Sequence, residues 1–171
     1  MWRTKVHVFS LTFRIIVDTD THIVKLSTTT KTLAYRKMNV YLVDDDGEDH
    51  EIFEMALEET SLGVQFKSFY SGPELIAYLN SGQTPQDQSG LLIFTDLNMP
   101  LMNGFELISN LNSLGHLSAG YKIVVYSTNA NDEYKKQAKN LGASLYLIKP
   151  ISFKALVNTL KEVLTELSVE I

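Results

Sequence analysis

Residues 91–104 read LLIFTDLNMPLMNG, an apolar run that ends at Thr95 and is followed at once by Asp96. A run of this kind, without alternation between apolar and polar residues, is typical of a strand covered on both faces of a parallel sheet. The Met99-Pro100 pair and Gly104 that follow argue against Asp96 being only a helix cap. The stretch therefore predicts a buried strand that carries a carboxylate at its carboxyl end.

The same rhythm extends along the rest of the chain from residue 38 onward. Apolar runs alternate with stretches whose apolar residues recur at helical spacing, most clearly in 153–167. Five βα units in succession imply an α/β fold, a doubly wound parallel sheet with helices on both faces. The runs that we expect to form strands are Val40–Val43, Val64–Phe69, Leu91–Thr95, Ile123–Tyr126 and Leu145–Ile148.

Polar residues come directly after four of these runs. They are the acids 44–46, Asp96, the hydroxyl pair Ser127-Thr128, and Lys149. The carboxyl ends of parallel strands meet at one edge of the sheet, so these side chains should share a pocket. Crowded carboxylates repel one another unless some are protonated or a cation binds, and oxygen ligands without His or Cys select Mg²⁺ or a similar ion. An ammonium and a hydroxyl complete a clamp for a phosphoryl group, with a carboxylate as nucleophile.

Four motifs resemble the receiver family of two-component response regulators, and in particular its single-domain, chemotaxis-regulator-like type. They are VYLVDDD at 40–46, TDLNMPLMNG at 95–104, VYST at 125–128 and GASLYLIKP at 142–150. Together they place 38–171 within the family's pattern in the right order and spacing. The resemblance implies a five-stranded parallel sheet with the flavodoxin-like strand order 2-1-3-4-5.

The resemblance also implies a role for each matching residue. Asp96 would be the phosphoacceptor. Asp44 and Asp45 would form the acidic pair that holds Mg²⁺ together with Asp96, and the backbone carbonyl of Asn98 would be a further ligand.

The phosphoryl-binding and switch residues implied by the resemblance lie on the next two strand ends. Ser127 would be the hydroxyl that swings toward the phosphoryl oxygens, and Lys149 would contact the phosphoryl group. Thr128 stands where Ala or Gly is more usual, so it should narrow access to the site. Tyr146 matches the aromatic switch residue, and Pro150 is a candidate for a cis peptide bond. Asn103 replaces a common Asp before Gly104, which a turn should tolerate.

We assign no chemistry to the remaining titratable residues. Asp46, Glu48, Asp49 and Glu51 are expected to be solvated acids at a helix start, where negative charge is favourable. The four histidines show no ligand spacing, and the chain contains no cysteine.

Residues 1–37 stand apart from the receiver-like region in charge and pattern. They carry a net charge of +5, whereas residues 38–171 carry −10. The turn signal at 18–21 predicts a loose hairpin from about Lys5 to Thr28, and an isolated hairpin is marginal in water. We expect this extension to be poorly ordered and dispensable, and a chain beginning at Met38 to fold. The acidic main body argues against nucleic acid as a partner, and the absence of a spanning apolar run predicts a cytoplasmic protein without membrane contact.

The resemblance implies a phosphorylation switch rather than an ordinary enzyme, because the domain would catalyse only its own phosphorylation and hydrolysis. A histidine kinase or histidine phosphotransfer protein would supply the phosphoryl group. With one helix left after Pro150, output is expected through a partner on the face formed by 132–141, 145–148 and the last helix. The exposed lysines expected there are Lys135, Lys139, Lys154 and Lys161.

Two other classes of function stay open at this point. In a haloacid-dehalogenase-like phosphatase, the sequence Asp44-Asp45-Asp46-Gly47 would imitate an Asp-x-Asp motif and Asp44 would be the nucleophile. That class needs an acidic metal-binding pair after the lysine, and the acids there lie along an amphipathic helix. A receiver that only docks, without phosphorylation, is the third class.

Overall fold

The computed structural model describes residues 7–8, 11–12, 14–17, 24–27, 38–83, 90–115 and 121–169. The chain divides into two units, 1–35 and 36–171. In the first unit, β1 (His7–Val8) pairs with β2 (Leu11–Thr12), and β3 (Arg14–Val17) pairs with β4 (Val24–Ser27), both antiparallel. The turn signal at 18–21 lies outside the described residues.

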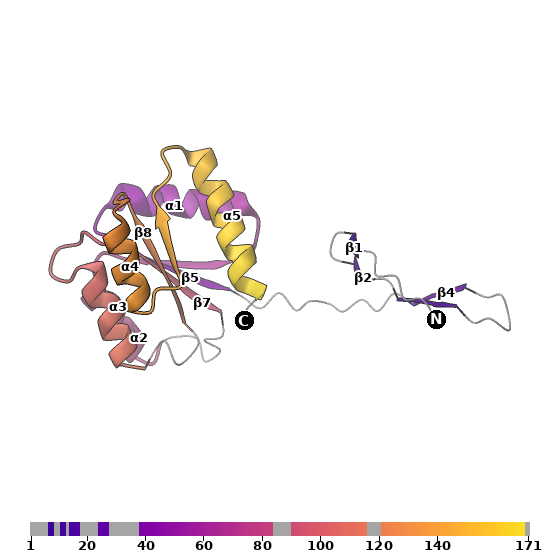
Figure 1. The fold of residues 1–171 in the computed structure, drawn as a ribbon, viewed down its shortest axis with the longest axis horizontal. Coiled ribbons are helices and arrows are strands. Elements are labelled where there is room, and N and C mark those ends of the chain that lie inside the picture. Colours follow the sequence, from indigo (N-terminus) through magenta and orange to yellow (C-terminus); the bar gives the residue numbers. More distant parts are fainter. Residues whose placement is uncertain are drawn as a thin grey trace. The chain divides into compact units, whose positions relative to one another are not determined.

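The second unit is built on a parallel sheet of five strands (Figure 1). The strand order is β6-β5-β7-β8-β9, which is the predicted order 2-1-3-4-5. The strands and helices alternate along the chain as β5 (Asn39–Val43), α1 (Gly47–Thr60), β6 (Gln65–Phe69), α2 (Gly72–Asn80), β7 (Leu91–Thr95), α3 (Gly104–Ser113), β8 (Lys122–Ser127), α4 (Asp132–Asn140), β9 (Leu145–Ile148) and α5 (Phe153–Val169).

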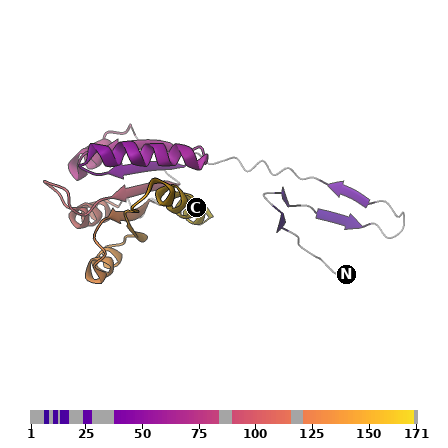
Figure 2. The ribbon, with the colours of Figure 1, turned by 90° about the horizontal axis from the view of Figure 1, so that it is seen from above.

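Helices cover both faces of this sheet (Figures 1 and 2). On one face, α1 and α5 pack over a core that contains Phe53, Phe94 and Leu160. On the other face, α2, α3 and α4 pack over a core that contains Leu75 and Ile108. Every residue of β5 and β7 is buried, because these strands lie between neighbours and under helices on both sides.

The edge strands differ from the central ones in burial. In β6 exposed and half-buried residues alternate up to the buried Phe69, and in β9 no residue is fully buried. The continuous apolar pattern therefore predicted the burial of the central strands but overstated it at the two edges.

Side-chain caps fix where the helices begin. The side chain of Asp46 accepts a hydrogen bond from the N–H of Glu48 at the start of α1. Asn103 and Glu106 form a reciprocal capping box at the start of α3, which explains why Asn is tolerated before Gly104. Both caps set the ends of loops that leave the carboxyl edge of the sheet. Within the described residues, no helix combines the length and apolar character that a membrane crossing requires.

Candidate functional site

Asp44 lies at the end of β5 and is almost completely buried. Its N–H donates to the carbonyl oxygen of Phe69, and its carboxylate Oδ1 accepts from the N–H of Asp46 at 3.1 Å. The imidazole Nε2 of His50 lies 2.8 Å from the Asp44 carbonyl oxygen, and the ring packs against Tyr70 with centroids 4.3 Å apart. We predicted no role for His50 from the sequence, but its imidazole stabilises the backbone at Asp44 through this contact.

Asp96 lies at the end of the neighbouring strand β7 and is 6% exposed. Its N–H donates to the carbonyl oxygen of Val43, and its Oδ2 accepts a 2.7 Å hydrogen bond from the N–H of Asn98. Gly104 packs so closely on this turn that a Cβ there would clash with the carbonyl oxygen of Asp96. The glycine in the motif is therefore required by close approach of α3 to the backbone of the site.

Lys149 follows β9 and joins these carboxylates across the edge of the sheet. Its Nζ donates to Oδ2 of Asp44 at 2.7 Å and to Oδ2 of Asp49, also at 2.7 Å. The same Nζ lies 3.8 Å from Oδ1 of Asp96. The structure thus brings together three of the predicted site residues, Asp44, Asp96 and Lys149.

The sequence interpretation of Asp49 as a solvated acid at a helix start was wrong. Asp49 lies in the first turn of α1, and its side chain is 31% exposed and paired with Lys149. In the sequence Asp49 is one of several acids between residues 44 and 51, and nothing in that run distinguishes it from the others. A signal was nevertheless present, because the first turn of a helix that begins at the edge of the sheet must lie beside the site.

Burial and charge shift the pKa values in this group. Burial raises the pKa of Asp44 above its ordinary value, although the ion pair with Lys149 opposes the shift. Burial favours the neutral form of Lys149, but its hydrogen bonds to Asp44 and Asp49 outweigh this effect and raise the pKa of the ammonium. Lys149 is therefore a fixed positive charge at neutral pH.

Ser127 ends β8 and is fully buried. Among the described residues, its Oγ and the Nδ1 of His50 are the buried side-chain polar atoms without a hydrogen-bond partner. A buried hydroxyl without a partner is costly, so an orphaned donor at a strand end marks a place where a ligand can be bound. Thr128, the next residue, is exposed.

Tyr146 lies on β9, half-buried against the core beneath α2, α3 and α4. Its hydroxyl donates to the carbonyl oxygen of Asn129 at 2.7 Å. The ring therefore ties β9 to the loop that follows Ser127. Burial, and then the negative charge of Asp96, raise the pKa of this phenol, so it remains a hydrogen-bond donor at neutral pH.

The predicted metal ligands are only partly assembled. Within the described part of the chain, no group of three or more His, Asp or Glu side chains is arranged to hold a metal ion. Asp45 and Asn98 are exposed. Carboxylate oxygens of Asp44 and Asp96 nevertheless both lie near Nζ of Lys149. A metal ion bound at about the place of this ammonium would therefore have two hard oxygen ligands. The residues present therefore fit a divalent oxygen-binding ion, with Lys149 as its competitor for Asp44.

The expectation of a cis peptide bond before Pro150 was wrong, because the Lys149–Pro150 bond is trans. The trans isomer is intrinsically favoured by about 0.5–1 kcal/mol. With the trans bond, the N–H of Lys149 donates to the carbonyl oxygen of Ser127 at 2.9 Å, and Nζ reaches Asp44 and Asp49.

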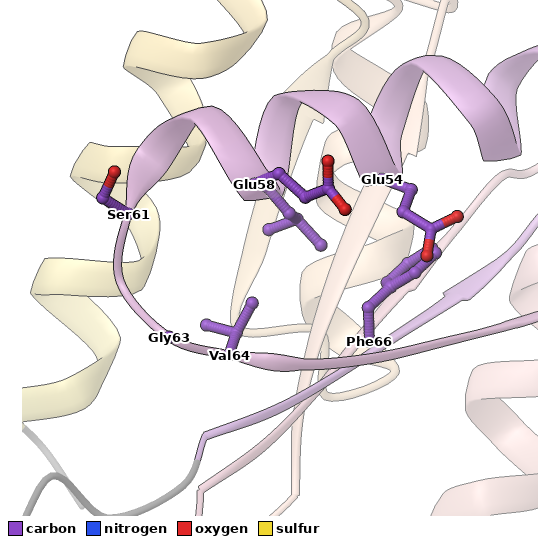
Figure 3. Close-up of a pocket in the computed structure, with 7 residues that line it drawn as sticks. Glu54, Glu58, Ser61, Gly63, Val64 and Phe66 are labelled. Atoms are coloured by element: carbon purple, nitrogen blue, oxygen red, sulfur yellow. The ribbon is translucent and has the colours of Figure 1, made fainter.

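A surface pocket elsewhere in the domain does not belong to this site. It lies between the C-terminal part of α1 and the start of β6, where Glu58, Ser61 and Val64 line it (Figure 3). Asp49 lies in the first turn of α1, at the other end of the helix. The chemistry of the carboxyl edge is therefore not that of this pocket.

Comparison with known proteins agrees with this geometry. Residues 40–161 match the response regulator receiver domain. The chain is 29% identical over 128 residues to two-component response regulator 24 of Arabidopsis thaliana, covering 75% of this chain and 85% of the relative. It is 33% identical over 76 residues to the transcriptional regulatory protein YesN of Bacillus subtilis, covering 44% of this chain and 20% of the relative.

A similar solved structure is that of the phosphorylated cyanobacterial phytochrome response regulator RcpA, with a TM-score of 0.64 and 25% identity over 74% of this chain and 90% of that one. The chain spans from one fifth to about half of the length of several curated relatives that it matches. Receiver domains are signalling phosphoacceptors. One structural neighbour is the Mn²⁺-bound form of response regulator Rcp1, with a TM-score of 0.61 and 23% identity over 74% of this chain and 91% of that one. On its family match, its strand order and its site, the chain belongs to the response regulator receiver domain family.

Proposed function

We propose that this protein is a phosphorylation-dependent switch in which Asp96 accepts a phosphoryl group from a histidine kinase or a histidine phosphotransfer protein. The observation that carries the proposal is the convergence of Asp44, Asp96 and Lys149 at one sheet edge, beside the unpartnered hydroxyl of Ser127. We further propose that 38–171 form the receiver and that 1–37 are dispensable for it.

The transfer needs one bond to form and one to break. A carboxylate oxygen of Asp96 bonds to phosphorus as the bond from phosphorus to the donor's imidazole nitrogen breaks and the imidazole leaves. Oδ2 of Asp96 is held by the N–H of Asn98, which orients the carboxylate, and Oδ1 faces Lys149. Asp96 is therefore held in a fixed direction before the donor arrives.

A divalent cation, which we propose is Mg²⁺, would supply charge neutralisation at the phosphoryl oxygens. Asp44, Asp45, Asp96 and the carbonyl oxygen of Asn98 are the residues that would hold it. Lys149 would exchange its bond to Asp44 for a phosphoryl oxygen, and Ser127 would donate its hydroxyl proton to another.

The switch would act through these two contacts. Movement of Ser127 toward the phosphoryl group would shift the loop after β8, to which Tyr146 is bonded at Asn129. The equilibrium between two conformers of α4, β9 and α5 would then change, as phosphorylation switches generally work. We propose that an output partner binds this face, where Lys139, Lys154 and Lys161 are exposed.

Labelling with acetyl phosphate and Mg²⁺ tests the proposal. Intact-protein mass spectrometry should show one added phosphoryl group on the wild type and none on Asp96→Ala. Labelling that persists in Asp96→Ala and disappears in Asp44→Ala would support the phosphatase alternative. A folded wild type that is never labelled would instead support a receiver that only docks.

A further inference from the structure

Lys149 has a second carboxylate partner, Asp49, which comes from α1 and not from a strand end. We propose that Asp49 is a positioning residue, which shares the ammonium of Lys149 with Asp44 so that a divalent cation can take Asp44 while the lysine stays in the pocket. This inference rests on the proposed function.

The distances show that the ammonium is shared. Nζ of Lys149 lies 2.7 Å from Asp44 and 2.7 Å from Asp49, whereas Asp96 is beyond hydrogen-bond distance at 3.8 Å. An ammonium has three N–H donors, and two of them are used in this way. Asp44 is buried and Asp49 is partly exposed, so the lysine bridges from the interior of the site to its rim.

The charges explain why sharing matters. Asp44, Asp49, Asp96 and Lys149 together leave two negative charges, and the exposed Asp45 adds a third, so the site attracts a divalent cation. Without Asp49, the lysine would give its whole charge to Asp44 and Asp96, the carboxylates that the cation needs. The cation would then have to displace a more firmly bound ammonium.

Asp49 also keeps the lysine available for the phosphoryl group. If Asp44 bound the cation, the bond to Asp49 would still hold Nζ of Lys149 within reach of Asp96. The lysine then needs only a short movement to contact an oxygen of the incoming phosphoryl group. The observed partner of the Asp49 side chain is Lys149, so Asp49 would act on the site through the lysine.

Calorimetric titration of the full chain with Mg²⁺ tests the role of Asp49. The matched pair is Asp49→Asn and Glu48→Gln, since both remove one charge from the first turn of α1 and Glu48 is exposed. Asp49→Asn should raise the Kd for Mg²⁺ by roughly three- to tenfold, and Glu48→Gln by less than about twofold. Equal effects of the two substitutions would overturn the inference.

A double-mutant cycle separates positioning from bulk charge. In a Lys149→Gln background, Asp49→Asn should change the Kd by less than about twofold, because no ammonium remains to be shared. An undiminished effect in that background would overturn the inference. The ammonium resonance of Lys149 in metal-free protein gives a readout that needs no second substitution. It should shift in Asp49→Asn and not in Glu48→Gln, and an unchanged resonance would also overturn the inference.

The inference and the proposed function fail in different ways. If the wild type binds Mg²⁺ and is labelled, but Asp49→Asn behaves like Glu48→Gln, only the role of Asp49 is overturned. If the wild type binds no Mg²⁺ and is never labelled, both are overturned.

Discussion

The ammonium group of Lys149 lies 2.7 Å from a carboxylate oxygen of Asp44, a residue 105 positions earlier in the chain. This ion pair connects the ends of β5 and β9, which are not neighbours in the sheet. With no metal present the pair offsets part of the cost of burying the Asp44 carboxylate. It must be rearranged before a cation and a phosphoryl group can enter.

Removal of the lysine should therefore destabilise the metal-free protein. Lys149→Ala leaves the buried carboxylate of Asp44 without its cationic partner, which should lower the free energy of unfolding by about 2–4 kcal/mol. Urea unfolding in EDTA measures the loss, and Mg²⁺ should restore part of it because the cation replaces the missing charge. Lys154→Ala, on the exposed start of α5, should stay within about 0.5 kcal/mol of the wild type. An equal loss in both variants would contradict this role of the ion pair.

The hydroxyl of Ser127 should contribute little to the resting state and much to the phosphorylated one. Because its Oγ has no partner, Ser127→Ala should change the stability of the metal-free protein by less than about 1 kcal/mol. The chemical-shift changes that beryllofluoride, a phosphoryl mimic, produces in α4 and β9 should be much smaller in this variant. Thr95→Val is the comparison, since Thr95 is also buried but its hydroxyl donates to the Asp96 carbonyl oxygen. Thr95→Val should lower the free energy of unfolding of the metal-free protein by about 1 kcal/mol or more. Full beryllofluoride shifts in Ser127→Ala would contradict the switch role.

Gly104 should tolerate no side chain. Gly104→Ala places a Cβ against the carbonyl oxygen of Asp96. The free energy of unfolding should therefore fall by about 2 kcal/mol or more, and Asp96 should be labelled more slowly. At Gly47, the first residue of α1, the nearest atoms to an added Cβ belong to Tyr70 and lie 3.8 Å away. Gly47→Ala should therefore be neutral or stabilising by up to about 1 kcal/mol. Thermal unfolding of the two variants compares these effects, and a harmless Gly104→Ala would contradict the close approach.

The raised pKa of Asp44 predicts how stability depends on pH. A carboxyl whose pKa is higher in the folded state contributes stability that is fully present below its unfolded pKa and is lost as the pH rises through the folded value. At neutral pH the buried carboxylate therefore weakens the metal-free protein. Asp44→Asn should raise the free energy of unfolding by about 1 kcal/mol near pH 7, and this gain should shrink as the pH falls toward about 4.

Asp46→Asn is the control for that measurement, because Asn also caps a helix and Asp46 is exposed. It should stay within about 0.5 kcal/mol of the wild type at each pH. A gain for Asp44→Asn that grows toward acid pH would contradict the predicted direction.

The fold was largely predictable because its signals are local and repeated. The five predicted strands match the observed ones within one residue at each end, since continuous apolar runs mark strands covered on both faces. The strand order came from the resemblance of the motifs to a known family. The convergence of Asp44, Asp96 and Lys149 followed from the rule that carboxyl ends of parallel strands share an edge.

The remaining features depend on side-chain geometry that no local pattern encodes. The contact of Asp49 with Lys149 joins residues 100 positions apart and depends on where α1 begins relative to the lysine. The trans bond before Pro150 could not be predicted from the sequence, because the two isomers differ intrinsically by only about 0.5–1 kcal/mol. The missing partner of the Ser127 hydroxyl could be seen only once the surrounding atoms were placed.

The most direct test of the central claim is to locate the phosphoryl group. The full chain is labelled with acetyl phosphate and Mg²⁺, reduced with borohydride, which converts an aspartyl phosphate to homoserine, and sequenced by tandem mass spectrometry. A phosphoacceptor at the end of β7 predicts homoserine at residue 96 and at no other aspartate. Homoserine at residue 44, or none at all in protein that is folded and binds Mg²⁺, would contradict it.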